Sequence, residues 1–212
     1  MIHIYKLEVN PIRENSYIVN DESGEAIFID PGFFFDDERE MIRDYIRQEG
    51  LTPKLIICTH CHFDHVMGVN FVKNEYNLPF ECHNDDAFLV RLAPKQSAMF
   101  GFPLDEIENP DLFIRDGEII KFGNSELKAI HVSGHSPGHM VFYSEKNNAL
   151  FTGDVLFHSS IGRTDLPGGN YDELIRNIKN KLLVLPDETI VYSGHGPETT
   201  IGREKKKNPF LI

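Results

Sequence analysis

The chain has 212 residues, of which 41% are hydrophobic and 25% charged, a balance typical of a folded globular protein rather than a disordered one. Its 33 acidic residues outnumber 21 lysines and arginines, so the formal net charge is −12. This acidity argues against a general nucleic-acid binder, and there is no apolar stretch of about 18 residues that would predict a transmembrane helix.

The N-terminal segment predicts β-structure and lacks the pattern of a secretory signal. Residues 2–9 alternate apolar and polar side chains and include the acidic Glu8, which is untypical of a signal peptide. Two more strands are predicted at 16–20 and 25–30, and an Asp-Pro-Gly turn ends the second. We therefore expect a cytoplasmic protein whose three cysteines are reduced thiols.

The next part of the chain alternates helices and strands. Apolar residues at helical spacing predict a helix from about residue 36 to residue 49, and Gly50 ends it. Residues 55–58, Leu-Ile-Ile-Cys, are wholly apolar and predict a strand that is buried on both faces. Further segments predict a helix at 66–76, a strand at 80–83, and a helix at 84–98 that Pro94 breaks.

The second half of the chain is rich in predicted strands. After a loop at 99–110, five short strands are expected, at residues 111–115, 118–122, 126–132, 139–144 and 149–152. Periodic apolar residues then predict a helix at 170–183, a strand at 189–192 and a short helix at 201–207.

The order of strands followed by helices occurs twice along the chain, and no linker rich in Pro, Gly or Ser divides it. No internal repeat or low-complexity segment indicates another architecture. The sequence therefore predicts a single α/β (α+β) domain over residues 1–212, in which two β-sheets pack together with helices on the outside.

The loop after the strand at 55–58 holds the densest group of metal-ligand side chains, in the sequence His60-Cys61-His62-Phe63-Asp64-His65. His60 and His62 are two residues apart in extended backbone, so their side chains point the same way and Cys61 points away. Asp64 and His65 follow in the turn that opens the next helix, where they could serve a second position. Imidazole and carboxylate ligands favour zinc, and iron or manganese would also suit them.

Three later segments also place metal-ligand side chains directly after predicted strands. They are Ser133-Gly134-His135-Ser136-Pro137-Gly138-His139, Phe151-Thr152-Gly153-Asp154 and Ser193-Gly194-His195-Gly196-Pro197. The glycines in each segment allow tight turns and a close approach of the backbone to a metal. Together with the His60–His65 loop, these segments predict a metal centre at the ends of several strands.

With these motifs in this order, the chain resembles the metallo-β-lactamase-fold hydrolases over nearly its whole length. The motifs are Thr-His-Cys-His-Phe-Asp-His at 59–65, Gly-His-Ser-Pro-Gly-His at 134–139, Gly-Asp at 153–154 and Ser-Gly-His-Gly-Pro at 193–197. The resemblance implies a four-layer αβ/βα sandwich with a metal site at one edge of its two sheets.

The resemblance also implies a role for each ligand. One metal would be bound by His60, His62 and His135, the second by Asp64, His65 and His195, and Asp154 would bridge the two. The expected cofactors are therefore two divalent metals, with Zn²⁺ preferred over iron or manganese.

Within this superfamily the chain is most similar to the glyoxalase II-like branch, which hydrolyses thioesters of glutathione, and it looks like the short bacterial form. The local resemblance lies in Gly-Asp-Val-Leu-Phe at 153–157 and Ile-Gly-Arg-Thr-Asp at 161–165. Two features differ from the full-length enzyme. The chain ends at Ile212 without an added helical domain, and Thr164 and Asp165 replace an aromatic residue expected near Arg163. Both differences bear on glutathione specificity and leave the metal chemistry unchanged.

The expected reaction is hydrolysis of a small anionic thioester such as S-D-lactoylglutathione. A metal-bridged hydroxide would attack the carbonyl, and a metal would stabilise the developing oxyanion. A thiol leaving group, with a pKa of about 8.5, needs no strong general acid. Asp64 would also orient the hydroxide, which makes it the candidate catalytic carboxylate.

Arg163 is the candidate for binding a substrate carboxylate, because the guanidinium fork suits that group. An equal alternative is that Arg163 ties its own loop through Asp165. His131 and His139 are expected to support the site rather than to bind metal. The lysines at 205–207 spread over different faces of a helix, so we expect them to be solvated.

A second function stays open: a mononuclear-iron persulfide dioxygenase, a related branch that also has a Gly-Arg-Thr-Asp-like segment. Retention of His65 and His195 as a second site favours the hydrolase. The acidic balance disfavours nucleic-acid processing, the lack of cysteine ligands disfavours a structural zinc site, and the lack of a signal disfavours an exported β-lactamase. We expect a small-molecule substrate, and neither nucleic acid nor membrane as a partner. The sequence does not indicate an oligomeric state.

Overall fold

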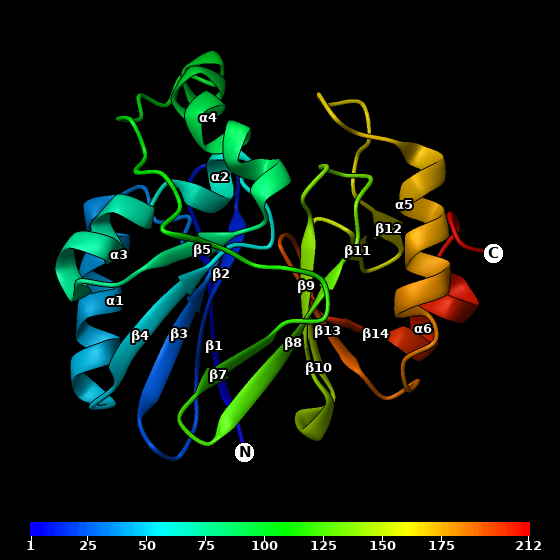
Figure 1. Ribbon diagram of the computed structural model, residues 1–212, viewed down its shortest axis with the longest axis horizontal. Helices are drawn as coiled ribbons and strands as arrows, with labels where there is room; N and C mark the ends of the chain where they lie inside the picture. Colours follow the sequence, from blue (N-terminus) through cyan, green and yellow to red (C-terminus); the bar gives the residue numbers. More distant parts are fainter.

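Two six-stranded β-sheets form the centre of the computed structural model, which describes residues 1–212 (Figure 1). In the first sheet the strands follow chain order: β1 (His3–Val9), β2 (Glu14–Asn20), β3 (Glu25–Ile29), β4 (Thr52–Ile57), β5 (Phe80–Cys82) and β6 (Leu112–Phe113). Strands β1 to β3 pair antiparallel, and β3 to β6 pair parallel.

The second sheet has the order β14 (Thr199–Thr200), β13 (Ile190–Ser193), β10 (Ala149–Gly153), β9 (Met140–Ser144), β8 (Ser125–His131) and β7 (Ile119–Phe122). Strand β13 is parallel to β10, and the other pairs are antiparallel. Strands β8, β10 and β13 therefore run in the same direction, and their carboxyl ends lie at the same edge of the sheet. A separate hairpin joins β11 (Leu156–Phe157) to β12 (Ser160–Ile161).

The helices lie outside the two sheets (Figure 1). On the side of the first sheet are α1 (Asp36–Gln48), α2 (Phe63–Val66), α3 (Val69–Tyr76) and α4 (Ala87–Met99), with a 3₁₀ turn at Asn84–Asp86. On the side of the second sheet are α5 (Tyr171–Asn177), a π-helical turn at Ile178–Leu182 that extends it, and α6 (Ile201–Lys207). None of the helices is long and apolar enough to span a membrane.

Three buried apolar clusters hold the layers together. One lies between the two sheets, and the others lie between each sheet and its helices. Ile27 and Phe142 belong to the central cluster, Phe28 and Ile42 to the first outer cluster, and Leu150 and Leu174 to the second. Ile27 and Phe28 are neighbours on β3 but belong to different clusters, because successive side chains of a buried strand point to opposite faces of the sheet. The expected four-layer αβ/βα sandwich is confirmed.

Two of the expected helices differ from the structure. Helix α4 continues through Pro94, so the break predicted there is wrong. The helix survives the loss of one hydrogen bond because its inner face is held by tertiary packing, through Leu89, Val90, Ala93 and Ser97. The helix expected at 66–76 is instead interrupted between α2 and α3, where the backbone N–H of Gly68 donates to the carbonyl of Pro31 at 2.7 Å.

Smaller differences concern the ends of elements. The strand expected at 55–58 already begins at Thr52, and the α-helical part of the segment 170–183 ends at Asn177. Strands β11, β12 and β14 were not predicted, because two residues are too few to show a periodic pattern.

Candidate metal centre

The ends of four strands bring the expected ligands to one edge of the sandwich. The His60–His65 loop follows β4 of the first sheet. The other three follow the parallel-running strands of the second sheet: His135 after β8, Asp154 after β10 and His195 after β13. Residues up to 135 positions apart in the sequence therefore meet because strand direction fixes where each loop emerges.

The first group of ligands consists of three imidazoles. The Nε2 atom of His135 lies 3.2 Å from Nε2 of His60 and 2.9 Å from Nδ1 of His62. All three side chains are buried. Three neutral imidazole nitrogens that converge in this way match the donor set of a zinc site with an open position.

The second group combines two imidazoles with a carboxylate. The Oδ2 atom of Asp64 lies 3.2 Å from Nε2 of His195 and 3.8 Å from Nε2 of His65. Their donor atoms lie within 4.8 Å of one another. The loop His60–His65 thus contributes to both groups, as its spacing suggested.

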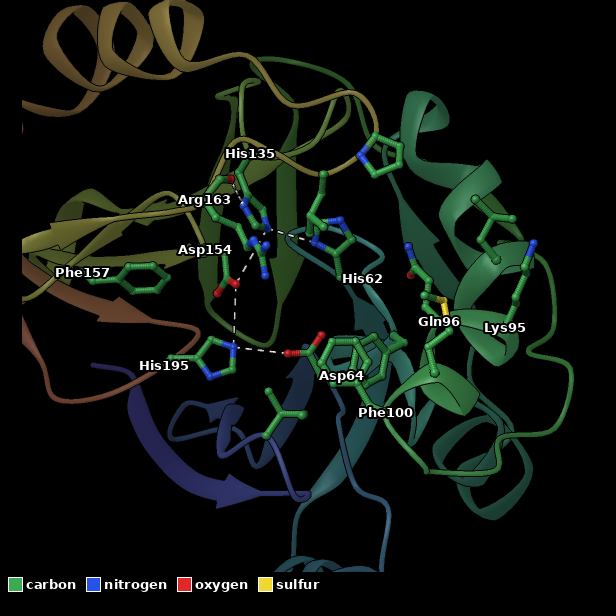
Figure 2. A pocket seen from close by; sticks show the side chains of 16 residues that line it. His62, Asp64, Lys95, Gln96, Phe100, His135, Asp154, Phe157, Arg163 and His195 are labelled. Atoms are coloured by element: carbon green, nitrogen blue, oxygen red, sulfur yellow. Dashed lines mark hydrogen bonds and ion pairs between the residues drawn. The ribbon is translucent and has the colours of Figure 1, made fainter.

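Asp154 lies between His135 of the first group and His195 of the second (Figure 2). Its Oδ1 is 3.4 Å from Nε2 of His65, and its Oδ2 is 3.7 Å from Nε2 of both His135 and His195. One carboxylate therefore contacts ligands of both groups with separate oxygens. This is the placement that a bridging ligand requires.

His135 and His195 use Nδ1 for hydrogen bonds to backbone carbonyls, which leaves Nε2 of each ring to face the centre. Nδ1 of His135 donates to the carbonyl of Arg163 at 2.8 Å, and Nδ1 of His195 donates to the carbonyl of Arg13 at 3.1 Å. Meanwhile Nε2 of His65 and Oδ1 of Asp154 are buried without a hydrogen-bond partner. Orphaned buried donors and acceptors are rare in folded proteins, so these atoms fit a metal that completes them.

The charges of the site favour a cation at the second group. Burial alone would lower the pKa of His65, but the carboxylates of Asp154 and Asp64 raise that pKa well above its usual value. Burial, together with His65 and His139, lowers the pKa of His60 well below its usual value. His60 is therefore neutral and ready to bind a metal, and the carboxylates around His65 attract positive charge.

Asp30 supports His65 and was missed as a functional residue. Its Oδ2 accepts from Nδ1 of His65 at 3.1 Å and from Oγ1 of Thr59 at 2.6 Å. Its Oδ1 accepts from the backbone N–H of Thr59, also at 2.6 Å. The sequence holds a signal for this role, because Asp30 follows an apolar strand as the other ligand segments do, but the Asp-Pro-Gly pattern is equally typical of a turn. Its left-handed φ of 51° accompanies this inward placement.

Asp86 joins the His60–His65 loop to the loop that follows β8, and it is a second residue of the site that sequence reasoning missed. Its buried carboxylate accepts hydrogen bonds from the backbone N–H of Gly138 at 2.6 Å, from Oγ of Ser136 at 2.7 Å and from the N–H of Cys61 at 3.4 Å. Burial raises the pKa of Asp86 to about 6. Nothing in the sequence around Asp86 indicates this role, because all its partners come from other loops.

Glycines keep the backbone close to the ligands. A Cβ on Gly194 would collide with Oδ1 of Asp154 and lie 2.6 Å from Cε1 of His65. Gly153 has a φ of +47°, and a Cβ there would collide with Oγ1 of Thr59. The glycines before Asp154 and His195 are therefore required by the limited space at the centre.

Other residues considered from the sequence lie outside the ligand groups. His139 stacks on His60 at 4.7 Å, and its Nε2 accepts the backbone N–H of Asp154 at 3.1 Å. His131 stacks on His83 at 4.5 Å, and Cys61 is buried in the outer core of the first sheet. His139 thus contacts a ligand and the backbone of Asp154, whereas His131 contacts no ligand, and Cys61 has the expected orientation away from the centre.

A cavity of about 660 Å³ opens onto the centre (Figure 2). Asp64, Asp154 and His195 line its floor, with apolar walls from Phe63, Phe100, Phe157, Leu166 and Pro167. Arg163 also lines it, but its guanidinium forms a two-point ion pair with Asp165, at 2.7 Å for both contacts. Both hypotheses for Arg163, that it binds a substrate carboxylate and that it ties its own loop, thus have a structural basis.

Comparisons with known proteins agree with this geometry. The sequence profile of the Metallo-beta-lactamase superfamily matches residues 9–195. The hydroxyacylglutathione hydrolase GloC of Haemophilus influenzae is 38% identical over 212 residues, which cover 99% of this chain and 98% of the relative.

Solved structures give the same result. The crystal structure of BLEG-1 B3 metallo-beta-lactamase has a TM-score of 0.91 at 38% identity, covering 99% of this chain and 100% of the other. That of TTHA1623 in a di-iron-bound form has a TM-score of 0.88 at 38% identity, covering 98% and 100%. ETHE1 from Myxococcus xanthus, with a TM-score of 0.81 at 23% identity and coverage of 98% and 83%, is similar in fold alone.

Proposed function

The chain belongs to the metallo-beta-lactamase superfamily, and on this premise we propose that it is a dinuclear metal-dependent hydrolase of a small thioester. The observation that carries the proposal is the pair of three-ligand groups on either side of Asp154. The similarity to hydroxyacylglutathione hydrolase GloC supports a thioester of the hydroxyacylglutathione type as substrate.

The proposed ligand sets follow the two groups of side chains. His60, His62 and His135 would hold the first metal, and Asp64, His65 and His195 would hold the second, with Asp154 placed to contribute to both. We propose Zn²⁺ in both positions, since three imidazoles suit it well; the same donors accept iron or manganese. The similarity to a di-iron-bound structure makes iron the main competitor.

Two divalent metals held there would supply hydroxide at neutral pH and polarise the carbonyl of the substrate. The protein residues position and shield this chemistry. Asp64 lies at the cavity floor within hydrogen-bonding distance of His195, where its carboxylate can orient the attacking water. Phe63, Phe100 and Phe157 form apolar walls that limit bulk water around the reacting thioester. The departing thiolate needs no acidic side chain because its conjugate acid has a pKa of about 8.5.

The competing function is a mononuclear-iron persulfide dioxygenase, which would use His60, His62, His135 or a neighbour, and Asp154. Such an enzyme has no need for a second complete set of ligands. The buried, partnerless Nε2 of His65 and its two nearby carboxylates favour the dinuclear hydrolase.

A variant of one ligand separates the two functions. His195→Ala removes a ligand of the second group only, and His3→Ala, an exposed histidine on β1, serves as the control. We expect wild type and His3→Ala to cleave S-D-lactoylglutathione. His195→Ala should lose roughly a hundredfold or more in kcat/KM and bind about one metal fewer per chain.

Elemental analysis and an oxygen electrode complete the experiment. Oxygen consumption with glutathione persulfide by a chain holding one iron, unaffected by His195→Ala, would replace the hydrolase with the dioxygenase. Absence of turnover across a panel of thioesters by protein holding two metals would contradict the proposal. Faster turnover of a β-lactam than of any thioester would change the substrate class.

A further inference from the structure

Helix α4 presents a second face, separate from the face packed in the core. Leu92, Lys95, Gln96 and Met99 are spaced at i, i+3, i+4 and i+7, and all four line the cavity above the metal centre. This spacing places them on one side of a helix. In Figure 2, Lys95 and Gln96 lie on the α4 side of the cavity, opposite Phe157, Asp154 and Arg163.

Lys95 and Arg163 are the two lysine and arginine side chains that line the cavity, and they differ in whether an acidic neighbour balances their charge. Arg163 is neutralised by its two-point contact with Asp165. Lys95 forms no ion pair and no hydrogen bond. In a chain with a net charge of −12, an unneutralised, exposed ammonium that lines the cavity is available to an anionic ligand.

Gln96 provides a second polar group on the same face. Its Oε1 is buried and accepts no hydrogen bond. A buried acceptor without a partner costs free energy, and a rotation of the Gln96 side chain that exposes it to the cavity would let a ligand N–H recover that cost. The neighbours one turn before and after, Leu92 and Met99, are apolar, and Met99 is 79% exposed.

We propose that this face of α4 is the substrate-recognition surface, with Lys95 binding a carboxylate of the thioester and Gln96 accepting a hydrogen bond from one of its N–H groups. Leu92 and Met99 then contact the apolar part of the substrate. The chemical class selected is a thioester of a peptide-like thiol that carries both a carboxylate and an amide N–H. The inference rests on the proposed thioester hydrolysis and assigns its specificity to α4 rather than to Arg163.

A binding measurement tests the surface without turnover. S-methylglutathione, a thioether that cannot be hydrolysed, is titrated calorimetrically into wild type, Lys95→Gln, Gln96→Leu and the control Lys128→Gln. Lys128 is an exposed, unpaired lysine on β8 and gives the same change in net charge. We expect about tenfold weaker binding for Lys95→Gln, about threefold for Gln96→Leu and no change for Lys128→Gln.

A matched pair of substrates then locates the contact. S-D-lactoylglutathione and its dimethyl ester differ only in the two carboxylates. Lys95→Gln should raise KM about tenfold for the acid, leave kcat unchanged and leave KM for the ester unchanged, with an effect that shrinks as salt increases.

The outcomes separate this inference from the proposed function. If the wild type cleaves the thioester and Lys95→Gln has the same KM for the acid, the role of α4 is overturned. The proposed hydrolase activity is then unaffected. Failure of the wild type to bind S-methylglutathione would also overturn it. Selective loss of binding in Lys95→Gln, with no turnover of any thioester by the wild type, would support the recognition surface and contradict thioester hydrolysis.

Discussion

The two sheets contribute to the metal centre in different ways. The first sheet supplies four ligands from one loop, His60–His65, whereas the second supplies three from three loops that lie far apart in the sequence. His65 of the first loop donates to the buried carboxylate of Asp30, whereas Asp86 ties the backbone of this loop at Cys61 to the loop that follows β8. In the second sheet, His135 and His195 donate to the backbone carbonyls of Arg163 and Arg13.

This difference shows where the centre can be altered. The Asp30 carboxylate can be removed by substitution, so the contribution of the first sheet can be weakened without changing a ligand. The backbone carbonyls that hold His135 and His195 cannot be removed by substitution, so the contribution of the second sheet is tested by changing its ligands.

The largest effect is expected from Asp154→Ala, because Asp154 contacts ligands of both groups. We expect kcat/KM for S-D-lactoylglutathione to fall roughly a thousandfold or more, with a folded far-UV circular dichroism spectrum retained. Loss of the folded spectrum would indicate a structural role. Retention of activity would remove Asp154 from the centre.

Asp30→Asn tests the support given by the first sheet. The variant weakens the hydrogen bond that orients His65, so affinity for the metal at the second group should fall about 10- to 100-fold. Affinity at the first group should fall less, because Asp30 reaches His60 by hydrogen bonds only through Thr59. Competition with a chromophoric chelator measures both affinities. Asp105→Asn, an exposed aspartate without partners, is the matched control. An equal loss of both metals would show that Asp30 supports the whole centre.

Asp86→Asn tests the junction between the two ligand loops through pH. Since the folded-state pKa of Asp86 is raised to about 6, the folded protein keeps a proton between about pH 4 and pH 6 that the unfolded chain has lost. The free energy of unfolding should therefore fall across this window as pH rises, by on the order of 2 kcal/mol more in wild type than in Asp86→Asn. Urea unfolding of metal-free protein measures the difference, and parallel curves would refute it.

The smallest effect is expected from Arg163→Ala. Because Asp165 already neutralises this half-exposed guanidinium, we expect KM for the anionic thioester to rise only about threefold. Asp165→Asn should lower KM slightly by freeing the guanidinium. A tenfold rise of KM in Arg163→Ala, with no change of KM in Lys95→Gln, would assign substrate recognition to Arg163 rather than to α4.

The difference between the sheets also explains how far the sequence could be interpreted. Four ligand side chains within six residues made the His60–His65 loop visible directly, and strand ends before His135, Asp154 and His195 indicated the rest. The four-layer fold followed from the resemblance that these motifs carry.

The supports of the ligands were harder to predict. Asp86 receives all its hydrogen bonds from residues distant in the sequence, so no local pattern reveals it. The continuity of α4 through Pro94 depends on packing in the core, and the cavity face of α4 depends on where the metal centre lies. Each of these is a tertiary effect that overrides or adds to local preference.

The most direct test of the dinuclear thioester hydrolase is a titration of metal-free protein with Zn²⁺ while cleavage of S-D-lactoylglutathione is followed. Two complete ligand groups around Asp154 predict that the rate rises and reaches its plateau at two equivalents of Zn²⁺ per chain. A plateau at one equivalent, or no cleavage at any Zn²⁺ concentration that fills both sites, would contradict the central claim.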